Sequence, residues 1–221
     1  KSVNEIIGRT DLLTQVNKGA SNLDDLDLNP LFVQADPGEN LRYCKDKHIN
    51  KVPDTLDEKI WSDIKDKIKP ESDNEFNYEI ENTSRSVGTR LSHHIYKKFG
   101  NNKLEENTVH IKLEGSAGQS LGAFLTKGIK LTVEGDCNDY VGKGLCGGTI
   151  VVYPSSKSSL VSNENTIIGN TVLYGATSGK LFASGQAGER FAVRNSGSFS
   201  VVEGCGAHGC EYMTGGTAII L

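Results

Sequence analysis

The stretch Ile129-Lys130-Leu131-Thr132-Val133-Glu134-Gly135 decides the fold, because a run of the same kind, Val109-His110-Ile111-Lys112-Leu113-Glu114-Gly115, lies one repeat before it. Both runs are rich in residues that favour strands, and both end in Glu-Gly. Such runs are typical of short strands that stop at a turn. The recurrence therefore predicts a stack of strand–turn units.

The same pattern continues to the end of the chain. Further short strands are predicted at Thr149–Tyr153, Thr171–Tyr174, Phe191–Val193 and Ser200–Val202. The strand ends fall at the evenly spaced positions Gly115, Gly135, Pro154, Gly175, Gly197 and Gly216. A regular period of this kind indicates stacked units, and here it is too short for a crossover helix between parallel strands. We expect a mainly β protein, a right-handed single-stranded parallel β-helix, with handedness taken from the usual crossover rule.

Composition divides the chain into two parts. Residues 1–107 hold 5 of the 25 glycines and 36 charged residues, whereas residues 108–221 hold 20 glycines and 16 charged residues. Glycine is suited to sharp turns and to places where neighbouring coils leave no room for a Cβ. We expect a parallel β-helix over 108–221, and over 1–107 a short helical and irregular connecting segment that packs on it.

Three helices are predicted in the first part. Apolar spacing favours a short amphipathic helix over Val3–Val16. A second helix is expected from Leu56 to Ile68, with Thr55 to Glu58 as a capping box at its start. A third runs from about Ser86 to Phe99 and ends at Gly100. Residues 21–53 read as extended chain and turns.

Charge and hydropathy exclude several classes. The net charge is −4, without the basic excess of a nucleic-acid-binding protein. No apolar run is long enough for a membrane-spanning helix, so no membrane partner is expected. Five cysteines form no regular framework and suggest free thiols in a reducing compartment. We therefore expect the cytoplasm, with an organelle as the alternative.

Two glycine loops and one cysteine pair resemble ligand sites. The segments Gly142–Gly147 and Gly204–Gly209 match G-x-G-x-x-G, but no helix is expected after either, so dinucleotide binding is disfavoured. Cys205 and Cys210 enclose His208 and lack a second ligand pair, which disfavours zinc. The adjacent histidines 93 and 94 are expected to be solvated residues of a helix. We predict no cofactor-binding and no metal-binding residue.

Charged residues gather on the predicted turns, at Asp136, Asp139, Lys143, Glu189, Arg190, Arg194, His208 and Glu211. A carboxylate pair on such a face would suit a carbohydrate-active enzyme, but the aromatic platforms of a sugar groove are few. No nucleophile–base spacing is present either, so no catalytic residue is predicted. Salt bridges, turn caps and contacts to a partner domain explain the cluster better. Arg190, Arg194, His208 and Glu211 are the candidates for a domain interface.

Several of these segments resemble one known family. They are Gly115–Phe124, Asn138–Leu145, Ile168–Thr177, Ala187–Gly197, Val201–Gly204 and His208–Gly216, with Glu5–Leu13 and Arg85–Thr89 upstream. Together they are similar to the C-terminal GXGXG domain of the glutamate synthase large subunit. The resemblance covers nearly the whole chain and is vaguest over 21–69. It departs from the family pattern at Cys137 and Cys146, where small residues without a thiol are expected.

The resemblance implies a right-handed parallel β-helix without catalytic residues. It implies a parent enzyme that makes two glutamates from glutamine and 2-oxoglutarate, with NADH, NADPH or ferredoxin as the electron donor. An amidotransferase domain would release ammonia for a synthase domain that carries FMN and an iron–sulfur cluster. No cofactor is expected in this chain itself, which reads as a fragment truncated at its C-terminal end and inactive alone.

The leading hypothesis is a structural domain that organises the amidotransferase and synthase domains of the same parent chain. One alternative is a stand-alone carbohydrate-active β-helix enzyme, which would cleave polysaccharides by itself. A second is a module that binds a small effector, which would show ligand-dependent stabilisation against heat.

Overall fold

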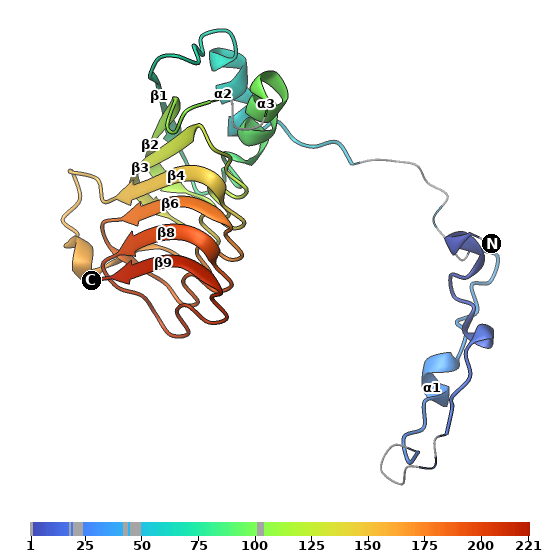
Figure 1. The fold of residues 1–221 in the computed structure, drawn as a ribbon. Coiled ribbons are helices and arrows are strands. Elements are labelled where there is room, and N and C mark those ends of the chain that lie inside the picture. The colour runs from blue at the N-terminus through green and yellow to red at the C-terminus, as the bar shows by residue number, and fades with distance from the viewer. Residues whose placement is uncertain (1, 18, 20–23, 42–43, 45–49, 101–103) are drawn as a thin grey trace. The chain divides into compact units, whose positions relative to one another are not determined.

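The computed structural model describes residues 2–17, 19, 24–41, 44, 50–100 and 104–221 (Figure 1). The chain divides into two compact units, Lys1–Val52 and Pro53–Leu221. The division predicted between residues 107 and 108 stays a prediction.

The first unit contains only short helical turns among its described residues. These are the 3-10 helices η1 (Val3–Glu5) and η2 (Thr10–Leu12) and the single α-helical turn α1 (Asn29–Phe32). The helix predicted over Val3–Val16 is wrong: Gly8 takes a left-handed φ of 70°, and the apolar side chains of that stretch are exposed. A helix of this length is marginal without a surface on which to bury its apolar face. Residues 21–23, 42, 43 and 45–49 of the predicted extended stretch lie outside the described residues.

The second unit is built on a parallel sheet. Its described residues form nine strands, all paired in parallel, in the order β1-β2-β3-β4-β6-β8-β9, while β5 pairs with β3 and β7 (Figure 1). The strands are β1 (Asn74–Ile80), β2 (Val109–Ala117), β3 (Ile129–Cys137), β4 (Cys146–Tyr153), β5 (Thr166–Ile168), β6 (Ser178–Ala183), β7 (Gln186–Ala187), β8 (Ser196–Val202) and β9 (Gly215–Ile220). The prediction of a mainly β, parallel fold is confirmed.

The register stacks identical positions of successive repeats. Ile111, Leu131, Ile150 and Leu181 are consecutive partners across β2, β3, β4 and β6, and all four are fully buried. Burying one such side chain contributes about 1.5–3 kcal/mol relative to leaving it exposed. The stacked apolar rows therefore supply the core, and the residues that alternate with them face outward.

Two helices pack together beside the strands. In α2 (Leu56–Ile64) the buried apolar residues are Ile60 and Ile64, and in α3 (Thr89–Phe99) they are Leu91 and Ile95. Gly100 ends α3, as predicted, and its N–H donates to the carbonyl of Tyr96. Both predicted helices are confirmed, the first of them over a shorter span.

The two adjacent histidines of α3 differ in their surroundings. His93 is exposed, as predicted. His94 is half-buried: its ring stacks on Trp61 with centroids 5.1 Å apart, and its Nε2 lies 2.8 Å from a Glu58 carboxylate oxygen. The prediction of a purely solvated pair is therefore wrong for His94, which helps to join α3 to α2.

The predicted capping box at the start of α2 is wrong. The Thr55 side chain makes no capping bond, and its buried Oγ1 has no hydrogen-bond partner among the described residues. Glu58 instead pairs with Arg90 and His94. The Glu58 side chain therefore joins α2 to α3, where the sequence pattern predicted that it would help to cap α2.

Thr55→Val is expected to leave the free energy of unfolding within about 0.5 kcal/mol of the wild type, because no capping bond is lost. Removal of a working threonine cap costs about 1 kcal/mol. Urea denaturation followed by circular dichroism distinguishes the two results. A loss near the larger value would show that the hydroxyl caps the helix after all.

Two of the predicted strands are turns. Thr171–Tyr174 and Phe191–Val193 lie in segments where Thr171, Leu173 and Ala192 adopt left-handed φ angles of 57–59°. Most of their apolar residues are buried, but these side chains point inward from a turn and not from a strand. Conversely, β1, β5, β6, β7 and β9 were not predicted.

No helix in the described parts of the chain is both long and apolar enough to cross a membrane.

Candidate functional site

Five turns of identical backbone design follow one another along the second unit. In each, the first, third and fifth residues take left-handed φ angles of 55–65°. The turns are Ser120–Phe124, Tyr140–Gly144, Thr171–Gly175, Arg190–Arg194 and His208–Tyr212. Left-handed backbone is unfavourable for residues with a Cβ, so its repetition marks a conformation that the surrounding structure enforces.

The N–H groups of the first and fifth residues of a turn point toward the next coil, and the N–H group of the third residue points toward the previous coil. In the second turn, Tyr140 and Gly144 donate to the carbonyls of Asn170 and Tyr174 in the next coil, each at 2.8 Å. Gly142 donates to Leu121 of the previous coil, also at 2.8 Å. The first, third and fourth turns repeat this scheme, and the last turn keeps the bond to the previous coil, from the Cys210 N–H to the Phe191 carbonyl. The turns are therefore bonded to one another much as strands are in a sheet.

Side chains divide by position within the turn. The third residue points inward, and Leu173 and Ala192 at this position are fully buried. The first and fifth residues point outward, as the exposed Phe124 and Tyr212 show. The stack therefore presents an outer surface, the turn face, made of first and fifth residues together with Lys143, Tyr174 and Glu211 from the fourth position, where Ala123 and Val193 are buried.

The four predicted interface candidates lie together on the turn face. His208 Nδ1 is 2.7 Å from a Glu211 carboxylate oxygen, and Arg190 Nη1 is 3.9 Å from the other oxygen. The Arg194 guanidinium lies over the Tyr212 ring at 5.8 Å. The structure thus brings Arg190, His208 and Glu211 into one exposed ionic cluster, with Arg194 beside it on the same turn as Arg190.

Two of the remaining charged turn residues have side-chain contacts within the stack, Asp139 with the backbone and Lys143 with a ring. Asp139 Oδ1 accepts a hydrogen bond from the N–H of Asn170, and Asn170 Oδ1 accepts one from Glu189, both at 2.8 Å. Lys143 lies over the Tyr140 ring at 5.5 Å. Asp139 is therefore a cap between coils, in keeping with the predicted reading of salt bridges and turn caps.

In the two glycine loops that resemble nucleotide-binding loops, backbone N–H groups are bonded to neighbouring coils of the stack. Gly142 and Gly144 belong to the second turn and donate their N–H groups to neighbouring coils. Strand β4 follows them, without the helix whose N-terminus would receive a pyrophosphate. Gly206 likewise donates to carbonyls of the preceding coil. These N–H groups are not available to a phosphate.

Cys137, Cys146, Cys205 and Cys210 form no disulfide. Burial raises the pKa of the Cys137 thiol well above its usual range, and it raises the pKa values of Cys146 and Cys210 as well. Raised pKa values keep these thiols protonated and poorly nucleophilic near neutral pH. No group of three metal-ligating side chains occurs among the described residues. The cytoplasmic location inferred from the cysteines stays a prediction.

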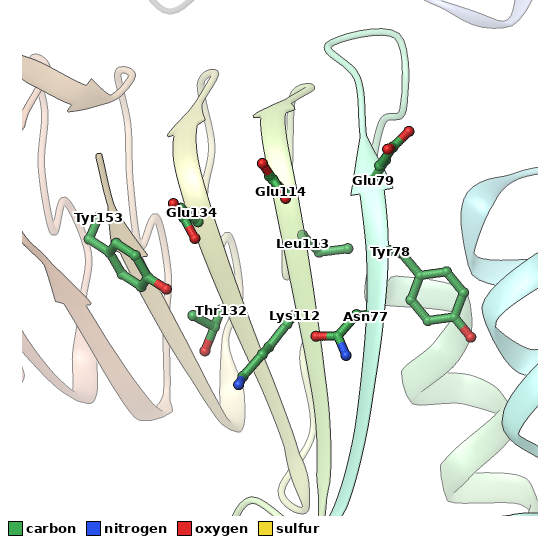
Figure 2. A pocket seen from close by; sticks show the side chains of 9 residues that line it. All are labelled: Asn77, Tyr78, Glu79, Lys112, Leu113, Glu114, Thr132, Glu134 and Tyr153. Carbon is green, nitrogen blue, oxygen red and sulfur yellow. The ribbon is translucent and has the colours of Figure 1, made fainter. Parts of the chain in front are cut away.

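A cavity of about 260 Å³ lies on the outer face of the sheet. Figure 2 shows Glu79, Glu114 and Glu134 side by side near the ends of β1, β2 and β3, and the register makes them consecutive partners. We call this trio the acidic row. Lys157, from the segment after β4, places its Nζ 3.0 Å from a Glu114 carboxylate oxygen. In the sequence, the recurring Glu-Gly pairs at Glu114 and Glu134 were the signal that could have located the acidic row.

Glu134 is held by the same segment. Its Oε1 lies 3.2 Å from the Ser156 nitrogen and 3.2 Å from the Ser155 hydroxyl, both of which donate to it. These bonds favour the ionised form, so they lower the pKa of Glu134, the Ser156 N–H most of all. A lowered pKa favours the folded state above the ordinary pKa of the carboxyl, and this contribution is lost as the pH falls through the lowered value.

We expect an NMR titration to place the pKa of Glu134 below the ordinary glutamate value. In the double variant Ser155→Ala, Ser156→Ala the pKa should rise only part of the way back, because the backbone N–H of residue 156 still donates. Titration of Glu134 at or above the ordinary value would show that the segment after β4 does not rest on it.

Parallel strands in register and stacked left-handed turns define a class of repetitive module. In this class, glycines help to form the turns and their bonding from coil to coil. A family model described as the GXGXG motif matches residues 57–221, and the chain belongs to that family. The spacing of alternate residues in the motif's name is the spacing of the left-handed positions in each turn.

The relatives agree with the resemblance seen in the sequence. The chain is 62% identical over 221 residues to the glutamate synthase [NADPH] large chain of Azospirillum brasilense, covering all of this chain and 15% of that protein. It is 46% identical to the glutamate synthase [NADH] of Schizosaccharomyces pombe and 45% identical to the ferredoxin-dependent glutamate synthase 2 of Synechocystis, again over its full length, covering 11% and 14% of those proteins. The recognition of the GXGXG domain is confirmed.

Proposed function

We propose that the chain is a non-catalytic structural domain of a glutamate synthase large chain. In this role it organises an amidotransferase domain and a synthase domain, so that ammonia released from glutamine reaches 2-oxoglutarate. The carrying observation is the turn stack: its glycines and N–H groups are engaged in bonding coil to coil. Support comes from the family match and from relatives of which this chain covers only 10–15%.

The proposed architecture is a right-handed single-stranded parallel β-helix. The main path of the sheet follows chain order from β1 to β9, which is the order that a coiling chain produces. From β2 to β9 the chain passes through one of the stacked turns between successive strands of this path, whereas β1 and β2 are connected through α3. A right-handed coil is the usual sense of connection between parallel strands.

In this proposal FMN and the iron–sulfur cluster lie in the synthase domain of the parent chain. The names of the relatives include NADPH, NADH and ferredoxin, so the electron donor of the parent is left open. These relatives lend no support to a carbohydrate-active enzyme or to an effector-binding module.

The turn face is proposed as one surface toward the other domains, through Arg190, Arg194, His208 and Glu211. The test is the double variant Arg190→Ala, Arg194→Ala in the intact large chain. We expect fewer than two glutamates to form for each glutamine hydrolysed, with free ammonia making up the difference, because misplaced domains lose ammonia to solvent. The measurement compares ammonia released with glutamate formed in the same reaction.

Lys143→Ala is the matched control, since it removes a cation from an earlier turn of the same face. Stoichiometric turnover in the double variant, with the domains still assembled, would remove these arginines from the interface.

A further inference from the structure

The outer face of the sheet changes character along the stack. Over β1, β2 and β3 it carries the acidic row together with Lys112 and Thr132. Over β4, β6, β8 and β9 it carries mainly apolar side chains, beside Thr149, Thr217 and Lys180, whose Nζ lies 2.6 Å from a Glu106 carboxylate oxygen. We call the second region the apolar sheet patch, and it consists of Val151, Tyr153, Phe182, Phe199, Val201 and Ile219.

The register makes this patch continuous. Val151, Phe182, Val201 and Ile219 are consecutive partners across the four strands. The Phe182 and Phe199 rings lie 6.0 Å apart, centroid to centroid.

These side chains lie on the outer face, because the residues that alternate with them, such as Leu181 and Val202, are fully buried. Phe182 and Phe199 each keep more than a third of their surface exposed, at 36% and 37%. Two exposed phenylalanines in contact are unusual on a surface that faces only water. A contiguous exposed apolar patch marks a contact surface, and parallel sheets are generally covered on both faces.

The charges beside the patch indicate what covers it. Glu134 is the partner of Tyr153 in the register, so the acidic row reaches the edge of the patch. Within the chain, a lysine already lies on this row, through the pair between Lys157 and Glu114. The complementary surface is therefore apolar at its centre and carries lysine or arginine where it faces Glu134.

We propose that the apolar sheet patch is the surface on which a neighbouring domain of the same large chain packs, through apolar side chains with a cationic border beside the acidic row. This inference rests on the proposed function. The length of chain outside the structure favours such an occupant over a second copy, because this chain covers only 15% of the Azospirillum large chain.

Hydroxyl-radical footprinting with mass spectrometry tests the patch directly. The intact large chain and the isolated 221-residue chain are oxidised under identical conditions, and the modification rates of Phe182, Phe199 and Tyr212 are compared. We expect the rates of Phe182 and Phe199 to fall about tenfold in the intact chain, because the centre of a protein interface is fully buried. Tyr212 reports separately on the turn face.

Each outcome decides between the two proposals. Protection of Tyr212 without protection of Phe182 and Phe199 would overturn the patch and leave the proposed function standing. No protection at any of the three would contradict both. Protection already present in the isolated chain, with a dimer in sedimentation velocity, would assign the patch to a second copy and overturn the proposal.

A variant pair supplies an independent readout. In the intact large chain, the double variant Phe182→Thr, Phe199→Thr is expected to be modified at Tyr153 as fast as the isolated chain. Asn77→Thr, on the same face but in the charged region, should leave Tyr153 protected. The melting temperature of the isolated double variant confirms that it folds, and continued protection of Tyr153 in it would contradict the proposal.

Discussion

Gly135→Ala is expected to lower the melting temperature of the chain by about 10 °C. The substitution should cost roughly 3 kcal/mol or more of unfolding free energy. Each kcal/mol lowers the melting temperature of a domain of this size by some 2–4 °C. Gly135 pairs with Gly115 in the register and has a φ of 149°. A Cβ at this position would overlap the Gly115 carbonyl oxygen, which belongs to rigid backbone. The two central strands β2 and β3 would have to separate, and differential scanning calorimetry measures the cost.

Gly175→Ala is the matched control. Gly175 also has a left-handed φ, of 63°, but a Cβ there would meet no atom within 4 Å. The same position in other turns holds Phe124 and Arg194, so the backbone accepts a side chain. We expect a loss of about 1 kcal/mol, the usual cost of left-handed backbone for such a residue. Equal losses in the two variants would show that backbone angle and not close packing explains Gly135.

Asp57→Ala is expected to cost about 3–5 kcal/mol of unfolding free energy, since a buried charged acceptor is removed and its donors stay buried. Asp57 lies in α2, yet its carboxylate accepts hydrogen bonds from the N–H groups of Gly88, Arg90 and Leu91 at the start of α3, at 2.7, 2.8 and 3.2 Å. Burial raises the pKa of Asp57, while these N–H groups act in the opposite direction. The side chain holds the two helices together.

Urea denaturation of Asp57→Ala beside Asp63→Ala measures this effect. Asp63 is an exposed carboxylate on the same helix. Its removal should change the unfolding free energy by about 0.5 kcal/mol at most, as is usual for a surface substitution. If Asp57→Ala were as mild as Asp63→Ala, the helix pair would be held by its apolar contacts alone.

The strand–turn repeat could be predicted from the sequence because the strands that end in Glu-Gly are locally encoded. The turns at Thr171–Gly175 and Arg190–Arg194 could not be recognised as turns. Their apolar residues have strand-like composition, and only bonding to neighbouring coils imposes the left-handed backbone. Strand β1 was missed because its pairing partner β2 is distant along the chain, with helix α3 between them. The helix predicted at Val3–Val16 is interrupted by the left-handed backbone of Gly8.

The surfaces were predictable to different degrees. Arg190, His208 and Glu211 could be grouped because they lie in consecutive repeats, and the structure brings them into contact. The apolar sheet patch could not be found in the same way. Phe182 and Phe199 belong to different strands, and only the strand register shows that they lie side by side.

The most direct test of the structural role is a cryo-electron microscopy map of the intact large chain. We predict that this domain contacts both the amidotransferase and the synthase domain, with Phe182 and Phe199 covered by a neighbouring domain. A map in which the domain is attached only through a linker, with both its sheet face and its turn face exposed to solvent, would contradict the structural role.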